Sequence, residues 1–372
     1  MPITLSDFYK NKFGRKVYKL AVDAGCTCPT RDGRLDTRGC VFCSANGSGD
    51  FIPPKNLPIA EQLERAKLLV QKKAYGRGGP RFGEPKSLDN DQKLSQANDC
   101  GGARVPGVEK VSAEEKSSQS EKAAATFGKP TISCNDQKLS QAQEAPRLSA
   151  RNAAPAPAYI AYFQNFTNTY GDPLVLKQKY LDALAAPDIV GVDIATRPDC
   201  LGPQILSVIK ELCQKTFVTV ELGLQSVHQK TADWMRRGYP TSVYFDAVAA
   251  LKKKCPAVHI VTQLILGLPG EDDDDMLESV RRVVAAGSDG IKLTVLYVLA
   301  GTDLEKEWRA GKFECLSKEK YFELLKKILP LLPPQMVVHR LTGDGPKKIL
   351  LAPDWTKNKR QVLNELAALH LM

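Results

Sequence analysis

The sequence predicts an α/β fold in which parallel strands alternate with helices, as an open sheet or as a partial barrel. Three observations predict it. Short runs of β-branched and other apolar residues recur along the chain, patterns typical of amphipathic helices separate them, and the two kinds of segment alternate. Strands of a parallel sheet have both faces buried by crossover helices, so they appear as such continuous apolar runs.

Six strands and five helices are expected. The strands cover residues 17–24, 159–164, 189–195, 217–224, 258–266 and 291–298, and the helices cover 59–73, 173–185, 203–214, 244–254 and 276–286. The second helix has the clearest start, because Asp172 can cap it and Pro173 fits its first position. The third helix has Pro203 just inside its start. We assign the core to residues 1–75 and 158–300, followed by a small C-terminal extension, 301–372.

Residues 76–157 differ in composition from the rest of the chain. Phe82 and Phe127 are their only aromatic residues, and Gly, Pro, Ser, Gln, Ala and Lys dominate. Such a segment buries too little apolar surface to offset the entropy lost on ordering. It also contains NDQKLSQA twice, at 90–97 and 135–142. Two copies are too few for a solenoid, so we interpret the segment as a disordered, internally duplicated insertion.

The charge, hydropathy and cysteine distribution of the chain indicate which partners and which cellular compartment to expect. The formal net charge of +10 favours a polyanionic partner such as nucleic acid, although general basicity of the surface is the simpler reading. No segment reaches the roughly 20 apolar residues of a membrane helix, and the N-terminus has no apolar signal core. We therefore expect a cytoplasmic protein. The ten cysteines are too scattered for a disulfide scaffold.

Three cysteines lie close together after the first expected strand. Cys40 and Cys43 form a C-x-x-C pair, and Cys28 lies in the same Gly-containing loop. Three thiolates can hold a four-iron cluster and leave one iron open to a small molecule. A structural zinc site with Cys26 as fourth ligand is an alternative. A dithiol redox pair is another, but it does not explain Cys28.

Polar residues and glycines also occur in or directly after the other expected strands. In such folds, ligands bind at the C-terminal ends of the strands. They are the polar run 164–170, the segment 196–199, Glu221 and Gln225, the turn 267–270 and Lys292. Charged residues inside apolar strands are rarely buried without a partner or a task. Each feature has a simpler reading, a turn or a local ion pair, but together they indicate an active site.

These residues resemble the YhcC/YtqA family of radical S-adenosyl-L-methionine (SAM) proteins, and more distantly the radical SAM core of the elongator catalytic subunit. The resemblance covers most of the chain outside the insertion. Its motifs are the cysteine loop and the segments 196–200 (TRPDC), 221–225 (ELGLQ), 237–238 (RG), 267–271 (GLPGE) and 290–293 (GIKL). The family usually has Asn at the position of Thr30 and a residue other than cysteine at that of Cys26.

The resemblance implies the radical SAM barrel, here a partial (β/α)6 barrel, and two cofactors. Cys28, Cys40 and Cys43 would hold a 4Fe–4S cluster whose open iron binds SAM. Reductive cleavage of SAM would give a 5′-deoxyadenosyl radical that abstracts hydrogen from the substrate. The residues expected to contact SAM are Gln164, Asn165, Thr167, Asn168, Glu221, Gln225, Arg237, Gly267 and Gly270. Among them, Arg237 is expected to meet the SAM carboxylate and the backbone at 267–270 to approach the adenine. No catalytic side chain is assigned.

The resemblance further points to the wobble uridine of tRNA as substrate. Basic residues beside an aromatic one suit RNA binding, and the candidates are Arg340, Lys347, Lys348, Trp355 and Lys357. A one-electron donor such as a flavodoxin or ferredoxin is an expected partner, and a methyltransferase is a further candidate. Two alternatives stay open: a radical SAM enzyme acting on a small metabolite or peptide, and a non-catalytic RNA-binding protein stabilised by zinc or a cluster.

Overall fold

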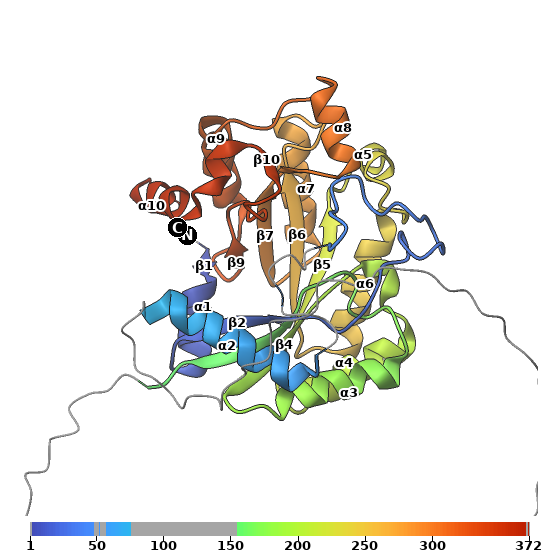
Figure 1. The fold of residues 1–372 in the computed structure, drawn as a ribbon, viewed down its shortest axis with the longest axis vertical. Coiled ribbons are helices and arrows are strands. Elements are labelled where there is room, and N and C mark those ends of the chain that lie inside the picture. Colours follow the sequence, from blue (N-terminus) through green and yellow to red (C-terminus); the bar gives the residue numbers. More distant parts are fainter. Residues whose placement is uncertain (1, 48–51, 53–56, 76–154, 370, 372) are drawn as a thin grey trace, which may run out of the picture. The chain divides into compact units, whose positions relative to one another are not determined.

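The computed structural model describes residues 2–47, 52, 57–75, 155–369 and 371, which contain one curled, fully parallel sheet (Figure 1). The sheet has eight strands in the order β1-β9-β7-β6-β5-β4-β3-β2. Their bounds are β1 Ile3–Thr4, β2 Val17–Val22, β3 Ala158–Phe163, β4 Ile189–Thr196, β5 Phe217–Gln225, β6 His259–Leu266, β7 Gly290–Val295 and β9 Val337–Arg340. From β2 to β7 the strands follow chain order, as successive crossovers of one hand require.

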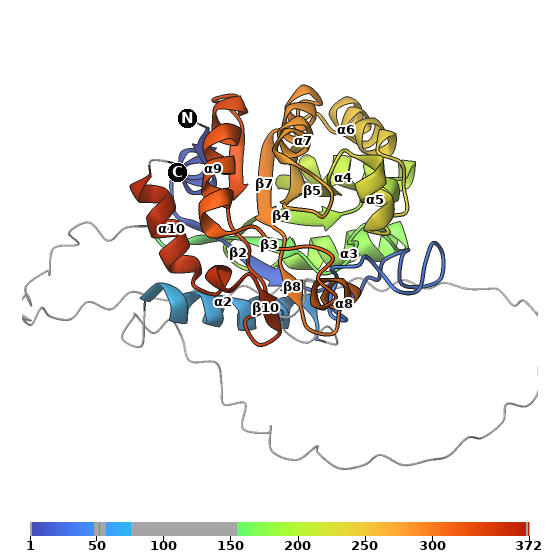
Figure 2. The same cartoon turned by 90° about the horizontal axis from the view of Figure 1, so that it is seen from above.

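Helices cover the convex face of the sheet, as Figure 2 shows. They are α2 Ile59–Tyr75, α3 Pro173–Leu184, α4 Pro203–Cys213, α6 Ser242–Lys254, α7 Asp273–Ala285 and α9 Lys318–Ile328. Asp172 caps α3 as expected, because its carboxylate accepts hydrogen bonds from the backbone N–H groups of Leu174 and Val175. The shorter helices are α1 Leu5–Phe13, α5 Gln229–Trp234, α8 Asp303–Arg309 and α10 Lys359–Ala368.

All six expected strands and all five expected helices are confirmed within a few residues, but the sheet is larger than six strands. Strand β9 comes from the segment assigned to the C-terminal extension, and it pairs with β7 on one side and with β1 on the other. The two strands have only four and two residues, respectively. Runs this short show no periodicity that would predict a strand.

The C-terminal segment is therefore continuous with the barrel. The described residues form one compact unit, and β8 (Val298–Leu299) and β10 (Leu350–Ala352) pair as an antiparallel ribbon. The expected insertion 76–157 lies almost wholly outside the described residues. None of the helices in the described part of the chain combines the length and apolarity that a bilayer span requires.

Alternation along each strand separates the apolar core from a polar interior. In β5, Val218, Val220 and Leu222 join the core packed beneath the helices. The residues between them point to the concave side, where Glu221 is buried and lines a cavity. This period of two places the charged residues of apolar strands inside the half-barrel.

Candidate active site

A cavity opens at the carboxyl ends of the strands, the end at which enzymes of this architecture bind ligands. The cysteine loop forms one side, and the segment after β9 forms another. Its walls include Cys28, Cys40, Cys43, Arg31, Gln164, Thr167, Arg197, Gln225, Leu296, Arg340, Asp344 and Pro346, and its interior reaches Tyr162, Glu221, Gln263 and Lys292. The structure thus brings together cysteines and strand residues that are far apart in the sequence.

The three cysteines of the loop share this cavity. The Cys28 sulfur accepts hydrogen bonds from the hydroxyls of Thr30 (3.4 Å) and Thr167 (3.2 Å). The Arg31 guanidinium donates to the carbonyl oxygens of Cys43 (3.3 Å) and Ser44 (2.6 Å), which fixes the end of the loop. These two hydrogen bonds hold the Cys28 side chain in position.

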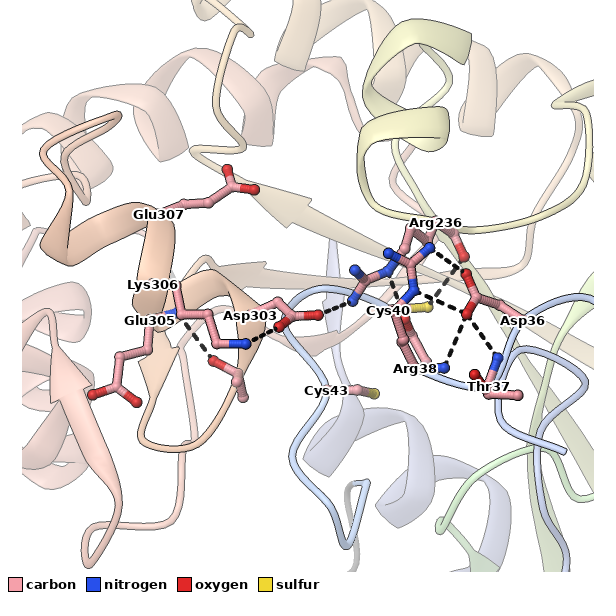
Figure 3. Close-up of polar contacts among 12 residues, drawn as sticks. Asp36, Thr37, Arg38, Cys40, Cys43, Arg236, Asp303, Glu305, Lys306 and Glu307 are labelled. Atoms are coloured by element: carbon pink, nitrogen blue, oxygen red, sulfur yellow. Dashed lines mark hydrogen bonds and ion pairs between the residues drawn. The ribbon is translucent and has the colours of Figure 1, made fainter. Parts of the chain in front are cut away.

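An arginine after α5 anchors the segment that carries Cys40. Arg236 donates to the carbonyl oxygen of Gly39 (2.9 Å) and forms an ion pair with Asp303 at the start of α8 (2.7 Å). Figure 3 shows this pair beside Cys40, whose sulfur lies 4.0 Å from the Arg236 carbonyl oxygen. Two elements remote in sequence therefore hold the loop in place.

Burial controls the protonation of two thiols in the loop. Burial raises the pKa of Cys40 to about 12 and also raises the pKa of Cys43, with repulsion from neighbouring thiolates adding to both shifts. A bound metal centre reverses this, because coordination deprotonates a thiol. Cys26 packs instead against the main core, where burial raises its pKa to about 11.

Comparison with known proteins decides the family. Residues 157–283 match the radical SAM superfamily, and residues 288–369 match the radical SAM C-terminal domain. The chain is 34% identical to YtqA of Bacillus subtilis (strain 168) over 98% of its own length and 87% of that protein. The chain belongs to the YtqA/YhcC family of radical SAM proteins.

Other relatives extend this result. Protein YhcC of Escherichia coli (strain K12) is 26% identical over 95% of this chain and 87% of YhcC. Elongator complex protein 3 of Schizosaccharomyces pombe is 28% identical, but only over 46% of this chain and 31% of that protein. A radical SAM enzyme of this family uses a 4Fe–4S cluster and SAM.

The donor set of the loop fits that cluster. Among the residues that the structure describes, Cys28, Cys40 and Cys43 are the cysteines that line the cavity, and no histidine lines it. Among the described residues, no three His, Cys, Asp or Glu side chains are close enough together to hold a single metal ion. Three thiols on one cavity match the three protein ligands of a 4Fe–4S cluster with one open iron, whereas a structural zinc site takes four protein ligands.

The residues expected to contact SAM divide into two groups. Gln164, Thr167, Glu221 and Gln225 line the cavity, so their contact with SAM stays a prediction. Asn165 and Asn168 are buried and are not among the lining residues. Asn165 donates to Asp23 (2.7 Å), and the Asn168 amide donates to three backbone carbonyls, those of Phe163, Asn165 and Ala195. These two asparagines shape the loop after β3.

Arg237 also lines the cavity, but it is bound by the protein itself. Its guanidinium donates to the carbonyl oxygens of Leu224, Ser226 and Tyr239 and to the Thr241 hydroxyl. These five hydrogen bonds use all five N–H groups of an arginine. Arg237 therefore ties the end of β5 to the segment after α5 and has no donor left for a ligand.

The two glycines of the turn after β6 do not line the cavity. Both have positive φ, +84°, which explains glycine at these positions. A Cβ on Gly267 would lie 2.8 Å from the Leu316 side chain, whereas a Cβ on Gly270 would meet nothing within 4 Å. The turn packs against Leu316 of the C-terminal segment, and the approach of its backbone to adenine stays a prediction.

A layer of buried charges forms the floor of the cavity. Glu221 accepts from Lys19 (2.9 Å), from Lys292 (2.8 Å) and from the Tyr162 hydroxyl (2.6 Å). Lys19 also pairs with Asp193. The two lysines hold the pKa of Glu221 well below its usual range despite burial, whereas burial and the Glu221 charge raise the pKa of Asp193 to about 7. Two cations and two carboxyl groups thus compensate each other in the interior.

The five RNA-binding candidates fall into two groups, one near the cavity and one away from it. Trp355 is half-buried against the core, where it packs on Tyr321 and donates to the carbonyl oxygen of Leu316 (3.0 Å). Lys357 pairs with Asp354 on the same short helical turn. Three candidates remain near the cavity: Arg340 lines it, and Lys347 and Lys348 are exposed on the segment that follows.

Sequence analysis missed several residues of the site. Lys19, Tyr162 and Asp193 complete the charged layer, and Arg31 and Arg236 hold the cysteine loop. Lys19 and Asp193 gave the same signal as Glu221, since each is a charge inside an apolar strand. The two arginines gave none, because their partners are backbone carbonyls and an aspartate far along the chain.

Proposed function

We propose that this radical SAM enzyme modifies the wobble uridine of tRNA. The reaction class follows from the family, and the substrate is our inference. Support comes first from the partial similarity to elongator complex protein 3. It comes second from the charge around the cavity, where Arg340 forms part of the wall and the exposed lysines of the adjoining segment offer phosphate contacts.

Different residues of the site would have different roles in the reaction. Cys28, Cys40 and Cys43 would hold the cluster, and when bound the cluster and SAM supply the radical that abstracts hydrogen from the substrate. Thr30 and Thr167 donate to the Cys28 sulfur, which orients this ligand. The apolar side chains of the cavity wall, such as Leu296, exclude water from the reacting atoms.

The partners follow from the same chemistry. Reductive cleavage needs one electron per SAM, so a one-electron donor such as a flavodoxin or ferredoxin is part of the proposal. A methyltransferase that completes the modified side chain is a further proposed partner.

The observation that carries the proposal is that three thiols line a cavity beside which the basic residues Arg340, Lys347 and Lys348 lie. The test compares tRNA from cells with and without the gene by nucleoside mass spectrometry. We expect a wobble-uridine derivative to change in the deletion strain, to return with the wild-type gene and not to return with Cys40→Ala. Unchanged tRNA nucleosides would refute the substrate and favour a small metabolite or a peptide.

A further inference from the structure

Lys292 of β7 is buried, but its ammonium group reaches the cavity. Its side chain is 7% exposed, and both Lys292 and Tyr162 line the cavity. The ammonium donates to the Tyr162 hydroxyl (2.8 Å) and to Glu221 (2.8 Å). A cation at the end of a cavity, held by two side chains from other strands, is a preorganised donor.

Of the two lysines that bind Glu221, Lys292 lines the cavity and Lys19 does not. Lys19 binds the other oxygen of Glu221 at 2.9 Å and also pairs with Asp193. Lys292 and the Tyr162 hydroxyl both bind the Glu221 oxygen that Lys19 does not bind. Lys19 would thus serve as the internal counter-ion, while Lys292 forms the boundary between the charged layer and the bound substrate.

We propose that Lys292 is a catalytic residue that donates a proton to the substrate during the bond rearrangement that follows hydrogen abstraction. The Nζ–H bond breaks, its electron pair stays on nitrogen, and the proton bonds to a basic atom of the substrate. The neutral amine regains a proton from water that enters when product leaves. This inference rests on the proposed function for the identity of the substrate.

The surroundings of Lys292 suit this role. Burial lowers the pKa of Lys292 to about 8, near the pH at which a proton donor is most effective. The charged or titratable groups that act on it come from five strands: Lys19, Tyr162, Asp193, Glu221, His339 and Arg340. Glu221 favours the protonated amine, and Arg340 disfavours it.

The test uses reconstituted full-length enzyme, SAM, a chemical reductant and tRNA from cells lacking the gene. The measured quantity is the ratio of modified nucleoside to 5′-deoxyadenosine. In Lys292→Ala we expect this ratio to fall about 100-fold or more, the usual contribution of a proton-transfer residue. Ethylamine added to the Lys292→Ala enzyme should raise this ratio at least about tenfold. The Lys292→Arg variant should keep the low ratio, because arginine does not release its proton.

Matched variants make the result decisive. Lys215→Ala, an exposed lysine beyond α4, should leave the ratio unchanged. Lys292→Gln keeps a donor for Glu221, so it serves if the alanine variant does not fold, and it should show the same loss. A ratio within about threefold of wild type in a folded variant, or a loss that ethylamine does not repair, would overturn the role of Lys292. Wild-type enzyme that cleaves SAM but changes no tRNA nucleoside would instead refute the proposed function, and the inference with it.

Discussion

Replacing Arg237 with methionine is expected to destabilise the protein without weakening its affinity for SAM. The substitution keeps an unbranched side chain but removes every donor from three backbone carbonyls and the Thr241 hydroxyl. A hydrogen bond from a charged donor contributes about 1.5–3 kcal/mol, and loss of one partner of a buried charged network costs about 3–5 kcal/mol. Water that enters beside the shorter side chain can bind some of the freed carbonyl oxygens. We therefore expect the free energy of unfolding to fall by about 3–5 kcal/mol.

Urea unfolding of the purified chain measures this loss, and the melting temperature should fall by roughly 6–15 °C. Lys230→Met, an exposed substitution on α5, is the matched control and should change the free energy of unfolding by less than about 0.5 kcal/mol. Isothermal titration with SAM provides the second readout. A stable Arg237→Met variant with a Kd for SAM raised tenfold or more would refute the reasoning and restore Arg237 as a carboxylate ligand.

Three further predictions concern the cysteine loop and a buried histidine at the start of β6. Cys40→Ala should abolish the brown colour and the cleavage of SAM, whereas Cys26→Ala should keep both, because Cys40 lines the cavity and Cys26 does not. Loss of the cluster in the Cys26 variant would mean that the third ligand is wrongly assigned. Thr167→Val removes a donor to the Cys28 sulfur and should lower the cluster's reduction potential by roughly tens of millivolts in an EPR-monitored titration; an unchanged or higher potential contradicts this. Burial lowers the pKa of His259 to about 4, so the unfolded state binds more protons as pH falls from about 6.5, and stability should drop by at most about 3 kcal/mol by pH 4. His259→Phe should flatten this part of the unfolding profile, and an equally steep profile would show that other groups cause it.

The sequence alone was informative where local pattern and chemistry coincide. Apolar runs gave the strands from β2 to β7, and the cap at Asp172 gave the start of α3. The spacing of Cys40 and Cys43 pointed to a shared metal centre, and the charges of Glu221 and Lys292 inside apolar strands pointed to the interior. Each signal lies within a few residues, so no knowledge of tertiary contacts is needed to detect it.

The choice between similar residues needed the tertiary structure. Sequence could not exclude Arg237 as a ligand or Trp355 as a stacking partner, because both types serve binding sites and cores equally well. The difference lies in the carbonyl oxygens and the ring that surround them, which come from other parts of the chain.

The size of the barrel has the same explanation. Strand β9 is too short to predict, and it joins the sheet because the edge of β7 offers backbone partners to Val337 and Val338. Local sequence therefore determined the strands from β2 to β7 and the residues that can bind a cluster. Long-range hydrogen bonds and burial decided which polar side chains reach the cavity, because both depend on residues that only the folded chain brings together.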